Sequence, residues 1–94
     1  MDSQFRLAEV VVSTAGRDRG KYYLVVDIED SQYVKVADGD KKKLKRPKRK
    51  NIKHLRATGY VIEELAIWLS EGKRVRNEDI KKAIKEYEKN EEAN

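Results

Sequence analysis

The residues with the clearest chemistry are the lysines and arginines between positions 41 and 55, a stretch that reads KKKLKRPKRKNIKHL. Nine of its fifteen residues are Lys or Arg, and none is acidic. Lysine acts on phosphate as a point charge, whereas Arg46 and Arg49 can bind a phosphate through two hydrogen bonds or stack on a base. The run therefore predicts a polyanionic partner. Its candidate phosphate ligands are Lys41, Lys42, Lys43, Lys45, Arg46, Lys48, Arg49, Lys50 and Lys53.

Charge runs of this kind are often solvated and disordered. Three features of the stretch favour an ordered or partly ordered loop over residues 41–50 instead. Pro47 restricts the backbone, Leu44 and Ile52 offer apolar anchors, and strand candidates lie on both sides. A loop anchored at both ends loses less conformational entropy on binding than a free tail does.

A second basic segment, AGRDRGK, precedes this loop at residues 15–21. Arg17, Arg19 and Lys21 add positive charge there, and Gly16 and Gly20 would let the backbone approach a phosphate closely. The alternative is an ordinary hairpin with a charged tip. The segment is not the eight-residue phosphate-binding loop of nucleotide-binding proteins, and a tight turn between two strands explains its glycines.

The sequence offers little for enzyme catalysis. The single histidine, His54, has no cysteine partner, and the chain contains no cysteine at all, which excludes a disulfide framework, an iron–sulfur cluster and a thiolate zinc site. The serines stand in no nucleophile motif. We therefore predict a protein that is not an enzyme, with no cofactor, no metal site and no small-molecule substrate.

The net charge of +5 is unevenly distributed along the chain. Residues 1–56 hold 15 Lys or Arg against 8 Asp or Glu, whereas residues 57–94 hold 7 against 9. The first part of the chain therefore carries the positive field, and nucleic acid is the first partner to consider. No apolar run approaches the roughly 20 residues of a membrane span, so a membrane partner is not expected.

Short apolar segments separated by turns predict strands over residues 7–14, 21–29 and 32–37, with a last short and partly irregular strand over 51–57. Several short strands at close spacing predict a small antiparallel sheet or barrel.

Helical periodicity begins after Thr58-Gly59. The apolar positions predict one helix over residues 60–70, ended by Gly72, and a second over 78–90, capped by Asn77. A connection this short predicts that the two helices pack as an αα-hairpin with a frayed C-terminal end. The lysines of the second helix are either a solvated face or an auxiliary RNA contact; they are Lys81, Lys82, Lys85 and Lys89.

The segment VVVSTAGRDRGKYYLVVDIED resembles a KOW motif, a strand–turn–strand unit in which a glycine, here Gly20, permits the tight turn. Together with RKNIKHL further on, residues 5–57 resemble the large-subunit ribosomal protein family called L-fourteen-e in archaea and eukaryotes. The helices of residues 58–94 depart from that pattern and suit a bacterial stand-alone relative.

This resemblance implies an α+β protein with a small five-stranded antiparallel SH3-like (KOW) barrel over residues 1–57 and a two-helix hairpin over 58–94. It also implies binding of ribosomal RNA through the first turn and the basic segment, in a cytoplasmic, ribosome-associated protein. By the same resemblance Asn51 and His54 join the candidate RNA contacts. For His54 the alternative is simple packing with one local hydrogen bond.

Two other functions remain open from the sequence. KOW domains also bind proteins, so the chain can alternatively be an interaction module that docks on the transcription or translation machinery through its helices. DNA binding is the third reading, since phosphate contacts alone do not distinguish the two nucleic acids.

Overall fold

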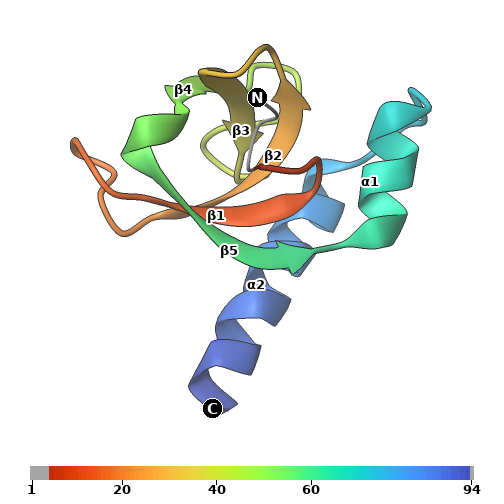
Figure 1. Cartoon of the computed structure of the whole chain (residues 1–94). Coiled ribbons are helices and arrows are strands. Elements are labelled where there is room, and N and C mark those ends of the chain that lie inside the picture. The colour runs from red at the N-terminus through yellow and green to blue at the C-terminus, as the bar shows by residue number, and fades with distance from the viewer. Residues whose placement is uncertain (1–4, 94) are drawn as a thin grey trace.

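The chain folds as an antiparallel sheet followed by two helices (Figure 1). The structure, a computed structural model, describes residues 5–93. The strands are β1 (Glu9–Ser13), β2 (Tyr22–Ile28), β3 (Tyr33–Ala37), β4 (Lys48–Asn51) and β5 (Leu55–Val61), with a 3₁₀ turn, η1 (Ile52–His54), before β5. The helices are α1 (Glu63–Ser70) and α2 (Asn77–Ala93). The predicted α+β class with five antiparallel strands is confirmed.

The sheet is curved but does not close into a barrel. Its strand order is β4-β3-β2-β1-β5, and every neighbouring pair is antiparallel. Within residues 5–93, β4 and β5 are therefore the two edges of the sheet rather than partners of each other. The predicted barrel is supported only as an open, curled sheet (Figure 1).

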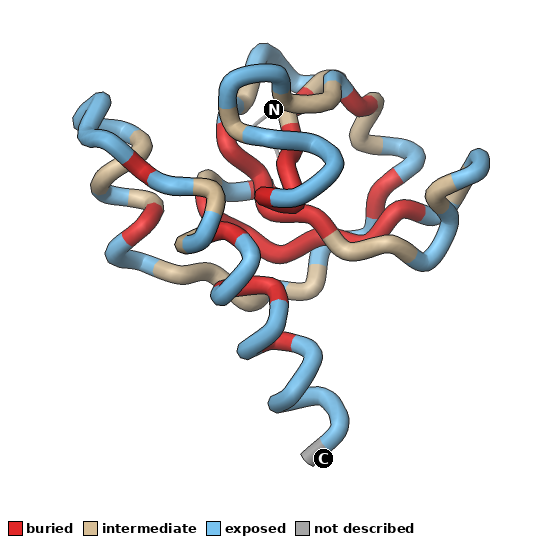
Figure 2. The backbone as a smooth tube through the Cα atoms, turned by 180° about the vertical axis from the view of Figure 1, so that it is seen from behind, coloured by how far each residue is buried: buried red, intermediate tan, exposed pale blue. Residues whose placement is uncertain are grey.

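The central strands are buried on both faces, which explains their continuous apolar runs. Neighbouring residues of a strand point to opposite faces. Val10 pairs with Leu24 and lies in the cluster beneath α2, whereas Val11 pairs with Tyr23 and lies in a second cluster on the opposite face. Figure 2 shows that β1, β2 and β3 are largely buried, whereas the edge strands β4 and β5 and the connecting loops are more exposed.

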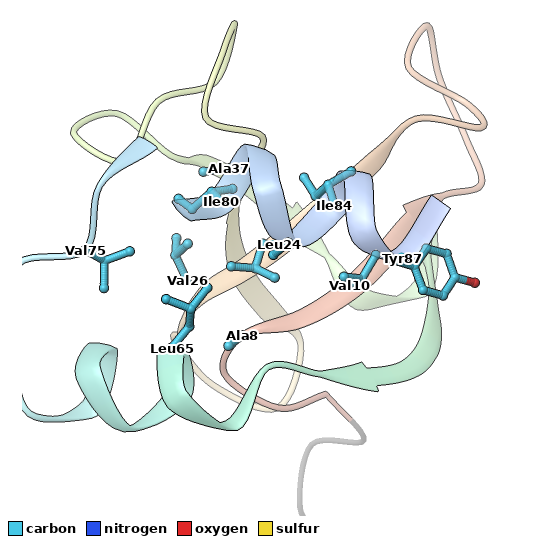
Figure 3. Packing of buried hydrophobic residues seen from close by; sticks show 11 residues of the cluster. Ala8, Val10, Leu24, Val26, Ala37, Leu65, Val75, Ile80, Ile84 and Tyr87 are labelled. Atoms are coloured by element: carbon cyan, nitrogen blue, oxygen red, sulfur yellow. The ribbon is translucent and has the colours of Figure 1, made fainter. Parts of the chain in front are cut away.

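Helix α2 covers one face of the sheet. Its buried residues Ile80, Ala83, Ile84 and Tyr87 recur at the three- and four-residue spacing of one helical face. These side chains join those of β1 and β2 in a single cluster (Figure 3). The principal contacts of α2 are with β2 and β1. The predicted packing of helix on helix is thus secondary to packing of helix on sheet, and α1 adds Leu65 to the same cluster.

Four predicted boundaries were wrong, and three of them concern β5, α1 and α2. Strand β5 continues through Gly59 to Val61, so α1 begins at Glu63 instead of residue 60, and α2 continues to Ala93 rather than ending at residue 90. The change of character at Thr58-Gly59 is an irregularity inside β5. Gly59 has a φ of 79°, its N–H donates to the buried Glu9 carboxylate at 3.0 Å, and the β1–β5 register shifts beside Glu9.

The fourth wrong boundary concerns the basic run itself. Residues 48–51 are strand β4, paired with β3 in the register Val34↔Lys50 and Val36↔Lys48. The predicted loop over 41–50 therefore ends at Pro47. Strand geometry fixes the direction of each basic side chain in β4, which a loop would leave open.

Candidate nucleic-acid interface

The β1–β2 turn folds an acidic side chain inward between two exposed arginines. Gly16 and Gly20 both have positive φ angles, 83° and 86°, and the Gly20 N–H donates to the Ser13 carbonyl at 2.8 Å. This turn leaves Arg17 and Arg19 exposed. Between them Asp18 points back toward the sheet.

The Asp18 carboxylate accepts four hydrogen bonds. Ser13 Oγ and Lys50 Nζ donate to Oδ1 at 2.8 and 3.2 Å, and Tyr23 OH and Lys48 Nζ donate to Oδ2 at 2.8 and 3.0 Å. Burial alone would raise the pKa of Asp18, but these four donors outweigh it and hold that pKa well below its ordinary value. Asp18 is therefore ionised at neutral pH and paired with two lysines of the basic run.

The two lysines share a face of β4 because they lie two residues apart. Lys50 is buried, and it also donates to Ser13 Oγ at 3.1 Å, while the Lys48 side chain is 36% exposed. Arg49 between them points to the opposite face of the sheet. There its Nε donates to Glu29 at 2.6 Å, and its guanidinium carbon lies 3.6 Å from the centre of the Tyr33 ring.

Lys21 connects the first turn to the start of the basic loop. Its Nζ lies 2.6 Å from Oδ2 of Asp38, and Oδ1 of that carboxylate accepts the N–H groups of Asp40 and Lys42, both at 2.8 Å. Burial would raise the pKa of Asp38, but the hydrogen bonds from Lys21, Asp40 and Lys42 lower it below its ordinary value. The Lys21–Asp38 ion pair and the two backbone bonds fix the loop where it leaves β3.

The middle of the loop is attached to α2. The Leu44 N–H donates to the Asn77 side-chain oxygen at 2.9 Å, and the Leu44 side chain packs against the cluster beneath the helix. The prediction that Asn77 caps its own helix is therefore wrong: its oxygen serves the loop. Gly39 lies so close to α2 that a side chain there would overlap the Asn77 carbonyl and approach Lys81 Cγ to 2.8 Å.

The first turn, the loop and β4 together surround one open hollow of about 820 Å³, which we call the basic basin. Six cationic side chains and one carboxylate, Asp18, line it, a formal charge of +5 with His54 neutral. His54 reaches the rim because its carbonyl accepts the N–H of Thr14 at 2.9 Å, which ties η1 to the first turn. The cations are Arg17, Lys21, Lys41, Lys42, Lys48 and Lys50.

The basin unites the two basic segments but does not contain every predicted contact. Asn51 uses its side-chain oxygen to accept the Lys53 N–H at 3.0 Å, and Arg49 lies on the other face of the sheet. The remaining predicted contacts are exposed but do not line the basin; they are Arg19, Lys43, Lys45, Arg46 and Lys53.

Sequence reasoning missed the residues that organise this site. Asp18, Ser13 and Tyr23 were treated as parts of a turn and two strands, yet they hold Lys48 and Lys50 in place. One signal was present: Asp18 is an acid enclosed by two arginines in a glycine-bounded turn. Its partners lie 30 and 32 residues away, and only the pairing of β4 with β3 brings them near.

No protein-family model matches the chain. Within the part of the chain that the structure describes, no helix is both long and apolar enough to cross a membrane. Residues 5–93 also contain no group of three or more metal-ligating side chains placed to hold an ion.

Proposed function

We propose that this chain is a non-enzymatic RNA-binding protein that takes the phosphate backbone of a structured RNA into the basic basin. The observation that carries the proposal is the convergence of the first turn, the basic loop and β4 on one hollow with a formal charge of +5. The resemblance to the L-fourteen-e family supports ribosomal RNA of the large subunit as the RNA and a ribosome-associated location.

The composition of the basin favours backbone contacts over base reading. Its lining is dominated by Lys and Arg, and the one tyrosine, Tyr23, is 1% exposed and so offers no ring for stacking. Double-stranded RNA gives proteins little access to base edges in its deep groove. Recognition is therefore expected to follow the shape and spacing of the phosphates.

Salt dependence measures how many cations act. If all six basin cations neutralise phosphates, the slope of log K against log salt is about −4 to −5. If only the three that form no ion pair within residues 5–93 do so (Arg17, Lys41 and Lys42), the slope is about −2 to −3. Affinity that does not change between about 50 and 200 mM salt would refute the proposal.

A pair of matched double variants tests the location. Lys41→Ser with Lys42→Ser removes two adjacent exposed cations at the basin, and the control, Lys73→Ser with Arg74→Ser, removes two adjacent exposed cations between the helices. We expect the basin variant to bind a large-subunit RNA fragment about 5- to 30-fold more weakly and the control to change little. Equal losses would show that net charge, and not the basin, governs binding.

A competition assay and a capture from lysate distinguish RNA binding from the other two functions. Competition by duplex DNA as effective as that by duplex RNA would replace the proposal with general nucleic-acid binding. Retention of a stoichiometric protein partner from lysate after nuclease treatment, unaffected by the basin variant, would replace it with the protein-docking function.

A further inference from the structure

The centre of the basic basin differs from its rim, because its lysines are held in place by a carboxylate. Lys50 donates to Asp18 at 3.2 Å and to Ser13 at 3.1 Å, and Lys48 donates to Asp18 at 3.0 Å. An ammonium group has three N–H donors. Among the contacts of residues 5–93, one donor of Lys50 and two of Lys48 thus remain for another acceptor beside the basin.

We infer that Lys48 and Lys50 form a binding site for a single phosphate group and that Asp18 is the residue that positions them. The inference rests on the proposed function only for the identity of the ligand, a phosphodiester of the RNA backbone. Inorganic phosphate presents the same oxygens and is the probe for the site itself.

Fixing the two ammonium groups before binding lowers the entropy lost when a phosphate arrives. A free lysine is a strongly hydrated charge on a flexible stem, and ordering it on binding is unfavourable. Here the Lys50 side chain is 10% exposed, and both Nζ atoms contact the same carboxylate. Folding has therefore already immobilised them.

Asp18 also places a negative charge near the site. Its replacement by a neutral residue is therefore expected to change phosphate affinity in opposite directions, depending on whether Asp18 positions the lysines or only repels the anion. If the basin attracts anions by net charge alone, Asp18→Asn removes one negative charge and strengthens phosphate binding by about threefold, for charges about 6 Å apart in water. If Asp18 positions the lysines, the same substitution frees both side chains and weakens binding by about tenfold, in spite of the lost negative charge.

The other carboxylate near the basin does not repeat this arrangement. Asp38 pairs with a single lysine, Lys21, and its second oxygen is occupied by the backbone N–H groups of Asp40 and Lys42. Only Asp18, among the described acids, brings two ammonium groups together on one side of the sheet. The site is therefore assigned to the Lys48–Lys50 pair.

Phosphate binding is measured first, without RNA. The full chain is titrated with inorganic phosphate at low ionic strength, and the lysine ammonium and backbone ¹H–¹⁵N resonances are followed. We expect saturable shifts at Lys48 and Lys50 and none at Lys73, which lies outside the basin. Shifts spread evenly over all exposed lysines would overturn the inference.

Three variants then separate positioning from charge. Asp18→Asn and Lys48→Met are each expected to weaken phosphate binding about tenfold, whereas Lys73→Met, which removes an exposed lysine outside the basin, is expected to weaken it less than threefold. Lys48→Met guards against a folding defect of Asp18→Asn, because the Lys48 side chain is 36% exposed and three donors to Asp18 remain. Tighter phosphate binding by a folded Asp18→Asn protein, or unchanged binding by Lys48→Met, would overturn the inference.

The RNA titration distinguishes this inference from the proposed function. If Asp18→Asn and Lys48→Met leave RNA affinity unchanged while the Lys41–Lys42 variant loses it, the proposed function holds and the Lys48–Lys50 phosphate site is refuted. Saturable phosphate binding at Lys48 and Lys50 by a chain that binds no RNA would keep the site and remove the function.

Discussion

Substitution of Gly39 tests whether α2 holds the basic loop in solution. Gly39 has a φ of 80°, and an ideal Cβ there would overlap the Asn77 carbonyl oxygen and lie 2.8 Å from Lys81 Cγ. The Lys81 side chain can move, but the Asn77 carbonyl belongs to the first turn of the helix. Gly39→Ala therefore forces the loop and the start of α2 apart.

Gly20 supplies a matched control, since its φ is 86° and a Cβ there would meet no atom of residues 5–93 within 4 Å. The left-handed conformation costs an alanine about 1–2 kcal/mol at either position. Overpacking against a well-packed element adds about 1–3 kcal/mol at Gly39 alone. We therefore expect losses in the free energy of unfolding of about 2–5 kcal/mol for Gly39→Ala and about 1–2 kcal/mol for Gly20→Ala.

Urea unfolding followed by the fluorescence of the single tryptophan, Trp68, measures both variants. A further open control is Gly72→Ala, at a φ of 72° with nothing within 4 Å of its Cβ. The difference between Gly39→Ala and the mean of the two controls is the cost of separating loop from helix. If all three variants lose the same stability, the loop does not pack against α2, and the contacts at Asn77 contribute nothing in solution.

Three further predictions concern stability. The folded-state pKa of Asp18 lies below its ordinary value of 3.8, so the ionised carboxylate stabilises the folded state above pH 3.8 and this stabilisation is lost as the pH falls. The urea midpoint of the wild type should therefore drop more steeply below about pH 4 than that of Asp18→Asn. Asn77→Ala leaves the Leu44 N–H without its acceptor and should cost about 1 kcal/mol and speed hydrogen exchange at that amide, whereas Asn77→Asp keeps the acceptor and should do neither. Lys50→Met removes a buried donor from Asp18 and should lower the free energy of unfolding by about 1–3 kcal/mol. Lys45→Met, at an exposed position, should change it by no more than about 0.5 kcal/mol, and equal urea midpoints for the two variants would contradict the Lys50–Asp18 ion pair.

The strands and the buried stripe of α2 were predictable because local periodicity reports burial directly. Val10 and Leu24 lie in continuous apolar runs, and Ile80, Ile84 and Tyr87 recur at helical spacing. Such patterns follow from which faces must leave water, whatever the rest of the chain does. The same reasoning left open whether the sheet closes into a barrel, because the pairing of edge strands depends on curvature that no local pattern encodes.

The residues of the basic run alone did not predict which of its cations pair with which acids. Counting charges treats Lys48, Arg49 and Lys50 as equivalent, but strand alternation sends Arg49 to Glu29 and the two lysines to Asp18. Glu29 precedes Arg49 by 20 residues and Asp18 precedes Lys48 by 30, so the pairing depends on the register of β3 with β4. The role of Asn77 escaped notice for the same reason, since its partner Leu44 lies 33 residues away.

Carboxylates inside a basic surface reduce its attraction for every polyanion, and Asp18 and Asp38 have this effect at the basin. A free tail with the same six cations and no carboxylate would attract phosphate more strongly at long range, but it would lose side-chain and backbone entropy with each contact. Asp18 and Asp38 weaken that attraction, but their ion pairs fix the positions of Lys48, Lys50 and Lys21. A surface with a fixed centre and an exposed rim of lysines favours RNAs whose phosphates already have the matching spacing. We therefore expect discrimination between folded RNA and flexible polyanions to depend on the residues around Asp18, and total affinity to depend on the exposed cations Arg17, Lys41 and Lys42.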